Sequence, residues 1–425
     1  MEVSVRAALI ACLIVGGLRA EPLPIDVSAE AAIVMNADTH AILYEKNAKE
    51  ILYPASLTKI ATALYTVEES GANLDNMAWA DQDAVGFVTE SAKRRSNYSM
   101  PPYYLEFGAN QIGIHPGEHL KLRDLLYAMM VSSANDAANV IAQHVGGSIP
   151  LFMKELNQYF QKLGMQATQF SNPHGLHHPD HVTTAYDLAI LTSAALKNPL
   201  FCDMCATTHY RRPETDKHPA STLVQTNRLL RRGKYYYPKA IGVKTGYTSL
   251  AKNCVAAAAR HKGRTLVVIL LKAPERAEMF RDAIRLFEAA FNQPMLEQTV
   301  LSAGPQQMHA KIQKTFQKVQ ATVPEPVLLR FYPAEEQALF AKVEWDELSL
   351  PIEAGQKIGA LYLQNEQGHT LAKTSLTATR SVSPSVLEQL LLGVKSLGPA
   401  GWLGMVCLLA LPLWLLLNVS PRRSR

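Results

Sequence analysis

The sequence predicts an α+β fold for residues 25–293, and three observations support this prediction. Two strand-like stretches open this part of the chain, and three more follow near its end. Between them lie several helical patterns, in which apolar side chains recur every three or four positions. Hydrophobic residues make up 48% of the chain, which is enough for a packed core. Strands at both ends with helices between them favour a single α+β domain.

The first predicted elements are a β-hairpin and a buried helix. Residues 32–36 and 41–45 flank the turn Ala37-Asp38-Thr39, which favours a hairpin. After it, apolar residues recur at helical spacing at Leu57, Ile60, Ala61 and Leu64. Pro54 suits the first turn of a helix, because its missing N–H would have no partner there. The pattern therefore predicts a helix that begins near Pro54.

The remaining elements of this domain follow from the same periodicities. Further helices are expected over residues 120–131, 136–145, 151–163 and 185–197, with Thr184 as the N-cap of the last. Strands are expected over residues 240–246, 253–260 and 264–272, and a long amphipathic helix over 274–292. Residues 82–107 are polar, contain proline and have no clear period, which predicts a surface loop.

A second, smaller domain is expected beyond the first. Residues 300–383 contain alternating stretches such as 327–331 and 357–363, separated by turn residues, which predicts a small β-rich domain. Residues 384–396 are expected to form a linker helix that leads away from it. Neither stretch contains a grouping of residues typical of catalysis.

The two ends of the chain carry apolar runs with different meanings. Residues 1–20 have Arg6, a short apolar run and a small residue at the end, which is typical of a cleaved signal peptide. Residues 397–419 carry no charge and are long enough for a transmembrane anchor, and the arginines of residues 420–425 favour a cytoplasmic tail. An anchor that lies partly in the membrane interface is the alternative. Lipidation of Cys12 is disfavoured, because this residue comes too early in the apolar run.

Charge and cysteine content exclude several function classes. The net charge of +5 is modest and the basic residues are scattered along most of the chain, so nucleic-acid binding is not expected. The exported body contains three cysteines, Cys202, Cys205 and Cys254. A metal site would need a second cysteine pair or histidines at ligand spacing, and the sequence has neither. Two neighbouring free thiols are therefore favoured over a metal site or a disulfide, and no cofactor is expected.

The first candidate for chemistry is Ser56-Leu57-Thr58-Lys59. On a helix, Lys59 lies one turn after Ser56, so its amine can reach the serine hydroxyl. A serine is a weak nucleophile until a base takes its proton, and a lysine desolvated by apolar neighbours can be that base. Ser249 and Lys252 have the same spacing, but no apolar helical stripe surrounds them. We therefore favour Ser56 and Lys59, with a solvated helix start as the alternative.

Two further groups complete the candidate site. Ser133 and Asn135 lie on a short turn between two predicted helices, where a hydroxyl can relay a proton and an amide can hold a peptide bond. The alternative is that Asn135 only caps the next helix. Lys244, Thr245 and Gly246 lie at the end of a predicted strand, where they offer a positive charge, a hydroxyl for a carboxylate and space for substrate backbone.

Taken together, these groups resemble the three motifs of penicillin-recognising serine enzymes. The surrounding sequences narrow the resemblance to the D-alanyl-D-alanine carboxypeptidases among the low-molecular-mass penicillin-binding proteins. The sequences that carry it are Pro54-Ala55-Ser56-Leu57-Thr58-Lys59, Ser133-Ala134-Asn135-Asp136-Ala137, Asn172-Pro173-His174-Gly175-Leu176 and Gly242-Val243-Lys244-Thr245-Gly246. The resemblance runs from about residue 25 to the C-terminus, because such enzymes also carry a small β domain and a C-terminal membrane anchor. It implies an antiparallel sheet with helices for the first domain.

The resemblance implies a role for each candidate residue. Ser56 would attack the bond between two D-alanines of a peptidoglycan stem and form an acyl-enzyme, with Lys59 as the general base. Ser133 and Lys244 would form the proton path, and Asn135 would hold the substrate amide. Thr245 and Gly246 would bind substrate, the backbone N–H groups of Ser56 and Tyr247 would form the oxyanion hole, and Arg228 is a further candidate for the terminal carboxylate. His174 belongs to a family motif, but a structural role is favoured for it.

The resemblance also implies partners and a location. The partners would be peptidoglycan stem peptides, β-lactam antibiotics and the membrane. The location would be the bacterial cytoplasmic membrane, with the catalytic domain on the periplasmic side. Two features depart from the family pattern: residues 82–107 are longer than usual, and Tyr247 replaces a histidine found in some relatives.

Three other functions remain open at this stage. A D,D-endopeptidase would use the same site on a longer leaving group. A β-lactamase would be expected to lack the tail domain and anchor and to carry a glutamate loop, which is not identified here. An inactive, membrane-tethered peptidoglycan-binding module would not form a covalent penicillin adduct.

Overall fold

The structure, a computed structural model, describes residues 9–11, 23–68, 73–335, 339–365, 368, 370–385 and 388–389. The described residues divide into two compact units. The first unit lies within residues 19–295 and 332–336, and the second lies within residues 1–18, 296–331 and 337–425. The candidate site residues all lie in the first unit.

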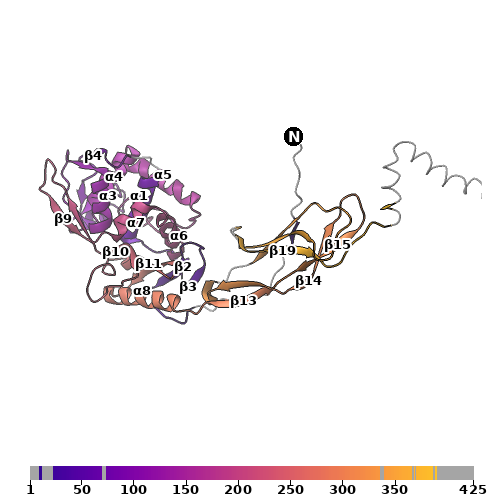
Figure 1. Ribbon diagram of the computed structural model, residues 1–425. Coiled ribbons are helices and arrows are strands. Elements are labelled where there is room, and N and C mark those ends of the chain that lie inside the picture. Colours follow the sequence, from indigo (N-terminus) through magenta and orange to yellow (C-terminus); the bar gives the residue numbers. More distant parts are fainter. Residues whose placement is uncertain are drawn as a thin grey trace, which may run out of the picture. The chain divides into compact units, whose positions relative to one another are not determined.

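The first unit is built on a five-stranded antiparallel sheet in the order β10-β11-β12-β2-β3 (Figure 1). The strands are β2 (Ala31–Asn36), β3 (Ile42–Lys46), β10 (Ala240–Thr248), β11 (Lys252–His261) and β12 (Arg264–Ala273). Segments from the two ends of this unit meet in the sheet, because β12 pairs with β2. The hairpin and the three late strands predicted from the sequence are confirmed.

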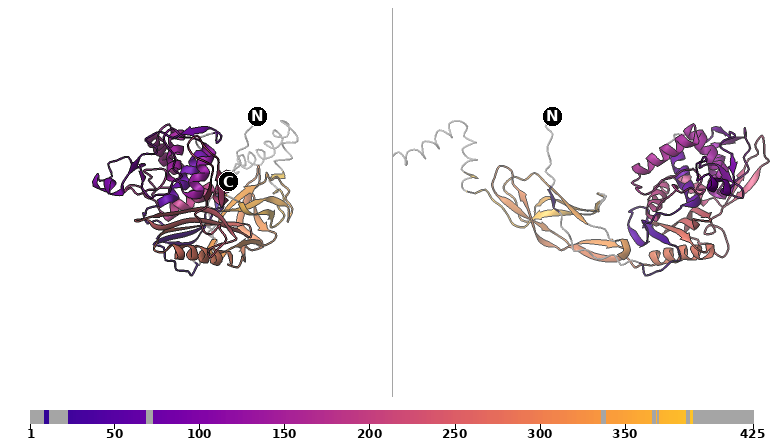
Figure 2. Two further views of the ribbon diagram at one scale, coloured as in Figure 1. Left: turned by 90° about the vertical axis from the view of Figure 1, so that its left-hand side faces the viewer. Right: turned by 180° about the vertical axis from the view of Figure 1, so that it is seen from behind.

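Both faces of the sheet are covered by helices. Alternate residues of one strand serve different cores: Ile33 and Met35 join one apolar cluster, whereas Ala32 and Val34 join the other. Helix α8 (Arg276–Phe291) covers the second face, and helices of the other apolar cluster lie on the side of the first (Figures 1 and 2). The sheet is buried on both sides, which explains why its central strands are apolar almost throughout.

The helices of the first face carry or support the candidate motifs. They are α1 (Thr58–Glu68), α3 (Leu122–Tyr127), α4 (Asn135–Gly146), α5 (Ile149–Lys162), α6 (Ala185–Ala195) and α7 (Pro199–Ala206). A 3-10 turn, η1 (Ala55–Leu57), precedes α1, and a π-helical turn, η2 (Ala128–Ser132), follows α3. Thr184 caps α6 as predicted, since its side chain accepts a hydrogen bond from the backbone of Asp187 at 3.0 Å. Helix α7 was not predicted.

One predicted boundary was wrong for an identifiable reason. The helix expected over residues 120–131 is divided into strand β7 (His119–Lys121), α3 and η2. Strand β7 pairs with β4 (Met77–Trp79), and this tertiary pairing replaces the first helical turn. The predicted helix start near Pro54 is confirmed, because Pro54 is the N-cap of η1 and η1 continues directly into α1.

Residues 82–107 are not an irregular loop, contrary to the prediction. They contain β5 (Phe87–Val88), α2 (Glu90–Arg95) and β6 (Leu105–Glu106), and the two strands pair in parallel. The buried amine of Lys93 fastens this segment by donating to the carbonyl of Tyr104 at 2.7 Å and to Glu106 at 3.0 Å. The period was hidden because each element is shorter than two helical turns.

A hairpin of β8 (His209–Arg212) and β9 (Ser221–Val224) leads into β10. The first unit also contains a short helical turn, η3 (Pro333–Glu335), which comes later in the chain than residue 295. Glu335 forms an ion pair with Arg264 and accepts a hydrogen bond from Asn36 at 3.0 Å. Ala334 joins the apolar cluster beneath α8.

The second unit is made of strands. A sheet in the order β1-β17-β18-β19-β15-β14 packs its own apolar core, and β13 pairs with β16. The strands are β1 (Leu9–Ala11), β13 (Leu296–Leu301), β14 (Gly304–Lys311), β15 (Lys318–Val323), β16 (Val327–Phe331), β17 (Phe340–Trp345), β18 (Lys357–Gln364) and β19 (Thr370–Ala378).

The predicted segments at the ends of the chain lie largely outside the described residues. Of the predicted signal peptide, only β1 is described, and of the predicted linker helix only residues 384–385 and 388–389. The predicted anchor over 397–419 and the tail over 420–425 are not among the described residues. Within the part of the chain that is described, no helix combines the length and the apolar character needed to cross a bilayer.

Candidate active site

Ser56 lies on the 3-10 turn η1, two residues before α1 begins. Ala55 has a φ of +49°, so the chain bends sharply just before the serine. The hydroxyl of Thr58 fixes this bend by donating to the carbonyl of Ala55 at 2.9 Å. Ser56 is partly exposed while its neighbours on both sides are buried. The turn therefore leaves the Ser56 hydroxyl accessible while the residues on either side of it are buried.

The amine of Lys59 is fully buried and has three oxygen neighbours. Its Nζ lies 2.7 Å from Oδ1 of Asn135, 2.6 Å from the carbonyl oxygen of His174 and 3.1 Å from Oγ of Ser56. The first two oxygens can only accept, so they take two N–H groups of the amine. In its neutral form the amine then directs its lone pair at Ser56 and accepts the proton of that hydroxyl. This is the geometry of a base beside a nucleophile.

The environment of Lys59 favours that neutral form. Burial is the largest cause that holds its pKa well below the usual value, and the positive charge of Lys244 adds to the effect. The buried carboxyl of Asp136 acts in the opposite direction. A lysine with a lowered pKa is able to take a proton at neutral pH.

Ser133 and Lys244 form the second half of the site. Nζ of Lys244 donates to Oγ of Ser133 at 2.9 Å and to the carbonyl of Thr245 at 3.0 Å. Ser133 follows η2 with a φ of +65°, a conformation that is unfavourable for residues other than glycine. Such strained residues often occur at functional sites. The backbone thus holds the Ser133 hydroxyl towards the lysine.

Lys244 is also fully buried, and its pKa is lowered to about 7. Burial is the main cause. Arg276 lowers this pKa further, and the buried thiol of Cys205 opposes the shift. At neutral pH the amine is therefore close to its titration midpoint, and small changes in nearby charge alter its protonation.

This shift predicts a pH-dependent stability. Between about pH 7 and pH 10, unfolded Lys244 holds a proton that the folded protein lacks, so the free energy of unfolding should rise with pH by up to about 1.4 kcal/mol per unit. Urea denaturation from pH 7 to 9 measures this slope. The Lys244→Met variant should lose this contribution, and equal slopes in both proteins would contradict the lowered pKa.

Asn135 is the first residue of α4, and its side chain does not cap the helix. Its amide oxygen instead accepts from Lys59, so the structure does not support the capping alternative.

The next residue, Asp136, was not predicted. Its buried carboxylate accepts hydrogen bonds from the backbone of Ile112, Gly113 and Ile114 at distances of 2.8 to 3.1 Å. These bonds fasten the segment beside the site to α4.

Gly246 packs against the serine turn. A Cβ atom at this position would lie 3.0 Å from the backbone nitrogen of Ser56 and 3.0 Å from Cβ of Ala55. Glycine thus lets strand β10 approach η1 closely enough to place Lys244 and Ser56 in one site.

The Gly246→Ala variant tests this close approach. We expect kcat/KM for peptide hydrolysis to fall roughly 10²-fold, because the added methyl group displaces the serine turn from its reactive geometry. Steady-state kinetics measure the loss, and thermal unfolding shows whether the variant remains folded. Unchanged kinetics would mean that the turn shifts without cost.

A second hydroxyl lies beside Thr245. The Oγ1 atoms of Thr245 and Thr226 are 3.0 Å apart, and Arg276 donates to the carbonyl of Thr226 at 3.3 Å. Arg228 is exposed and near enough to Arg276 to lower its pKa slightly, after the larger effect of burial. Among the described residues, no hydrogen bond joins Arg228 to Thr245. Arg276 was not among the predicted site residues, and it is the first residue of α8.

Tyr247 and His174 differ in exposure. Tyr247 follows Gly246 on strand β10 and is 64% exposed. His174 is fully buried: its Nδ1 accepts from the backbone of Leu176 at 3.1 Å and its Nε2 lies 3.0 Å from the carbonyl of Tyr103, an acceptor only. The ring is therefore neutral with its proton on Nε2, in agreement with a pKa that burial holds well below its usual value.

Gly175 explains why the His174 carbonyl reaches Lys59. It has a φ of +90°, and a Cβ atom there would lie 1.9 Å from the carbonyl oxygen of Ala55. The Asn172 side chain holds this turn through hydrogen bonds to the backbone of Gly175 and Leu176. The asparagine and the glycine in this segment therefore have a structural purpose.

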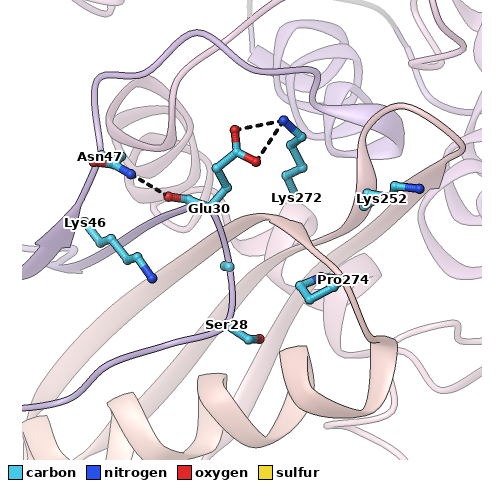
Figure 3. A pocket seen from close by; sticks show the side chains of 8 residues that line it. Ser28, Glu30, Lys46, Asn47, Lys252, Lys272 and Pro274 are labelled. Carbon is cyan, nitrogen blue, oxygen red and sulfur yellow. Dashed lines mark hydrogen bonds and ion pairs between the residues drawn. The ribbon is translucent and has the colours of Figure 1, made fainter.

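A separate open pocket lies where strand β3 ends, β11 begins and β12 ends (Figure 3). Its volume is about 590 Å³, and its lining includes Lys46, Lys252 and Lys272. Lys272 pairs with Glu30 at 2.8 Å and Lys46 with Asp26 at 3.1 Å, so most of its positive charge is compensated. Ser249 and Lys252, the competing pair in the sequence, are exposed in this region and do not form a buried site.

The cysteines of the described residues do not form disulfides. Cys202, Cys205 and Cys254 are free thiols, and burial raises the pKa of each. No cluster of three or more potential metal ligands occurs within the described ranges.

Comparison with known proteins gives a consistent family. The Peptidase_S11 family model, described as D-alanyl-D-alanine carboxypeptidase, matches residues 18–275. The chain is 32% identical over 358 residues to the D-alanyl-D-alanine carboxypeptidase DacF of Bacillus subtilis, covering 82% of this chain and 85% of the relative.

Solved structures agree in fold. Penicillin-binding protein 5 of Haemophilus influenzae has a TM-score of 0.58 and 21% identity, and the match covers 85% of this chain and 99% of that one. A D-alanyl-D-alanine carboxypeptidase of Mycobacterium tuberculosis has a TM-score of 0.55 and 28% identity, covering 65% and 97%. At 21% identity, the match to the Haemophilus influenzae protein shows the fold alone. Because it covers 85% of this chain, it includes residues beyond the first unit.

Proposed function

The chain belongs to the D-alanyl-D-alanine carboxypeptidase family, and from this membership we propose that it uses Ser56 to remove the terminal D-alanine from peptidoglycan pentapeptide stems. One observation carries the assignment of residues: Nζ of Lys59 lies 3.1 Å from Oγ of Ser56 in a fully buried setting. An inactive binding module would have no need for a desolvated amine beside a serine.

The geometry supports a two-step mechanism. Lys59 takes the proton of Ser56 as Oγ attacks the carbonyl between the two D-alanines. The backbone N–H groups of Ser56 and Tyr247 stabilise the negative oxygen, a contribution of about 3 kcal/mol per donor in comparable sites. Ser133, held by Lys244, passes a proton to the leaving D-alanine amine. Water then releases the shortened stem from the acyl-enzyme.

Substrate binding falls to the other residues of the site. The Asn135 amide lies beside Lys59 and can hold the peptide bond before the scissile one. Gly246 leaves room for substrate backbone along β10. The hydroxyl of Thr245 would receive the terminal carboxylate, with positive charge from Lys244 and Arg276 and, further out, from Arg228. A β-lactam would enter the same site and acylate Ser56.

Incubation of the purified protein with a pentapeptide stem analogue tests the proposal. Free D-alanine should appear, and a tetrapeptide stem that ends in a single D-alanine should release none. Intact-protein mass spectrometry should show a covalent adduct after exposure to penicillin. A protein that forms no adduct and releases no D-alanine would be a binding module, and one that rapidly hydrolyses penicillin would be a β-lactamase.

We also propose that the first unit works outside the cytoplasm. Residues 1–20 have the features of a signal peptide, residues 397–419 those of a membrane anchor and residues 420–425 those of a cytoplasmic tail. Together they support a protein of the bacterial cytoplasmic membrane with its active site on the periplasmic side.

Deletion of residues 397–425 tests the anchor. We expect the truncated protein to leave the membrane fraction while its kcat/KM on a soluble pentapeptide stays within about twofold, because the site lies in a different compact unit. Fractionation with carbonate washing measures the first effect. A truncated protein that stayed with the membrane would reject the anchor.

A further inference from the structure

A histidine that the mechanism does not use lies behind the serine turn. His181 is buried, and its Nε2 lies 2.7 Å from Oγ1 of Thr58. Its Nδ1 accepts from the backbone N–H of Ser171 at 3.0 Å, and its ring stacks on Phe170 with 4.6 Å between the ring centroids. The ring is therefore held at both nitrogens and on one face.

The backbone that follows His181 is also fixed. Val182 exchanges two hydrogen bonds with Gln169, at 2.9 and 3.0 Å, and Thr183 exchanges two with Leu52, at 2.8 and 2.9 Å. Leu52 comes only four residues before the nucleophile. The histidine and the serine turn thus belong to one hydrogen-bonded part of the first unit.

These contacts assign each proton. Since Nδ1 of His181 accepts a backbone N–H, the ring proton lies on Nε2 and is donated to Oγ1 of Thr58. The hydroxyl of Thr58 in turn donates to the carbonyl of Ala55 at 2.9 Å. The ring is neutral at neutral pH, because burial lowers its pKa to about 3. We call these three groups, the His181 ring, the Thr58 hydroxyl and the Ala55 carbonyl, the relay.

The relay ends on the peptide group that supplies a proposed oxyanion donor. The carbonyl of Ala55 and the N–H of Ser56 belong to one planar, trans peptide, so fixing the direction of the first fixes that of the second. Gly175 packs so closely against this carbonyl that even a Cβ atom would clash with its oxygen. Among the described residues, no acceptor takes the N–H of Ser56. This N–H is therefore available to a substrate oxygen, and its direction is set from the other side of the peptide.

The bend before the nucleophile needs such support. Ala55 has a φ of +49°, which is unfavourable for a residue with a side chain, and it persists because the surroundings hold it. Hydrogen bonds in a chain also polarise one another, so the relay strengthens the N–H at its end as a donor. A donor that is aimed in advance needs no reorganisation when negative charge develops on the substrate.

We propose that His181 is a positioning residue that acts through Thr58 to aim the backbone N–H of Ser56 at the oxygen of the tetrahedral intermediate. This proposal rests on the proposed function, because it concerns the oxyanion hole of that reaction. Within the described part of the chain, no hydrogen bond joins His181 to Ser56. The histidine therefore holds a geometry and passes no proton to the nucleophile.

Two substitutions separate the roles of the two ring nitrogens. In His181→Asn the amide oxygen takes the place of Nδ1 and can keep the bond from Ser171, but the side chain is too short to reach Thr58. In His181→Gln the amide nitrogen takes the place of Nε2 and can keep a donor for Thr58. A purely structural role would be kept at least as well by asparagine. The relay should survive only with glutamine.

The middle of the relay is tested by Thr58→Val, which removes the hydroxyl with little change in shape. The Ala55 carbonyl keeps the backbone N–H of residue 58 as a donor, so it is not left unpaired. Thr58→Ser retains the hydroxyl and should behave as the parent. The matched control is Thr192→Val, because Thr192 is also buried and donates to a backbone carbonyl, that of Leu188, at 2.6 Å.

Stopped-flow acylation by penicillin gives the dissociation constant of the non-covalent complex and the rate constant of the covalent step. We expect the rate constant to fall about 30-fold in Thr58→Val and about tenfold in His181→Asn, with dissociation constants within about twofold of the parent, because the relay acts on the intermediate alone. His181→Gln, Thr58→Ser and Thr192→Val should stay within about threefold of the parent rate. A boronic acid that forms a tetrahedral adduct with Ser56 should lose affinity by the same factors.

A double variant shows whether the two residues act as one unit. Thr58→Val/His181→Asn should be about as slow as Thr58→Val alone, because the relay is already broken at its middle. Rates are referred to the folded fraction, which circular dichroism measures. If His181→Asn does not fold, the comparison of Thr58→Val with Thr58→Ser decides, since only the hydroxyl differs in its ability to donate.

Several results would overturn the relay. Equal rates in His181→Asn and His181→Gln, losses that add in the double variant, or a boronic acid affinity that does not follow the rates would each make His181 a structural residue. Normal acylation in Thr58→Val would do the same and would leave the proposed function intact. A parent protein that forms no penicillin adduct would reject the proposed function and the relay with it.

Discussion

Replacing Ser56 by alanine is expected to reduce D-alanine release by roughly 10⁵-fold or more and to abolish the covalent penicillin adduct. The variant lacks the only atom that can carry the acyl group, so the two-step reaction cannot begin. Release of D-alanine is measured by an enzyme-coupled assay, and the adduct by intact-protein mass spectrometry. The fold should be unaffected, because Ser56 is partly exposed and contributes little packing.

The chain contains its own control for this experiment. Ser249 and Lys252 have the same spacing as Ser56 and Lys59, but both are exposed. Ser249→Ala should therefore keep full activity and full adduct formation. Labelling that persisted in the Ser56 variant and disappeared in the Ser249 variant would reverse the assignment of the nucleophile.

The second large effect concerns the base. Lys59→Met preserves the length and apolar character of the buried stem but removes the amine that takes the Ser56 proton. We expect the rate of acylation by penicillin to fall by roughly 10³-fold, within the usual range for the loss of a general base. Stopped-flow or quenched mass spectrometry measures this rate. Lys252→Met serves as the control and should acylate normally.

The same substitution should also affect stability. Without the amine, the Asn135 amide oxygen and the His174 carbonyl lose a buried donor, which costs about 1 to 3 kcal/mol per group. Removing a buried amine recovers part of this loss, so the net change should be small compared with the kinetic effect. If the rate fell only as much as the folded fraction did, Lys59 would be a structural residue and another base would have to be sought.

These predictions concern a single connected network. Ser56 contacts Lys59, Lys59 contacts Asn135, and the following residue, Asp136, fastens the segment of residues 112–114 by backbone hydrogen bonds. The segment of residues 82–107 joins the same network, because the Tyr103 carbonyl receives hydrogen bonds from both His174 and Asn139. A change in that segment can therefore reach the catalytic lysine through His174.

Much of the fold could be predicted from periodicity. The hairpin of β2 and β3, the long strands β11 and β12 and the helices α4, α5 and α8 have regular apolar patterns over many residues, and their positions agree with the predictions to within a few residues. The short elements β5, α2 and β6 could not be predicted, because the two strands have two residues each and the helix has fewer than two turns. These short elements are stabilised by tertiary contacts, such as the ion pair of Lys93 with Glu106.

The functional residues divide in a similar way. Ser56, Lys59, Ser133, Lys244 and Gly246 could be selected because their residue types and short spacings are tied to one chemistry. Asp136 could not be selected, since an acid in the first helical turn is a common helix feature. Arg276 could not be selected, since it belongs to no motif in the sequence. Only their contacts distinguish them.

The sequence by itself determined which side chains are available for the reaction and that they lie on a helix start, a turn and a strand, because these features depend on residues only a few positions apart. The tertiary structure decided what those side chains can do. The lowered pKa of Lys59 and of Lys244 arises from burial and from charges on residues that are far away in the sequence. These charges come close to the two lysines only in the folded chain. The bend at Ser56 similarly depends on Gly175 and Gly246, which reach it only after the chain has folded.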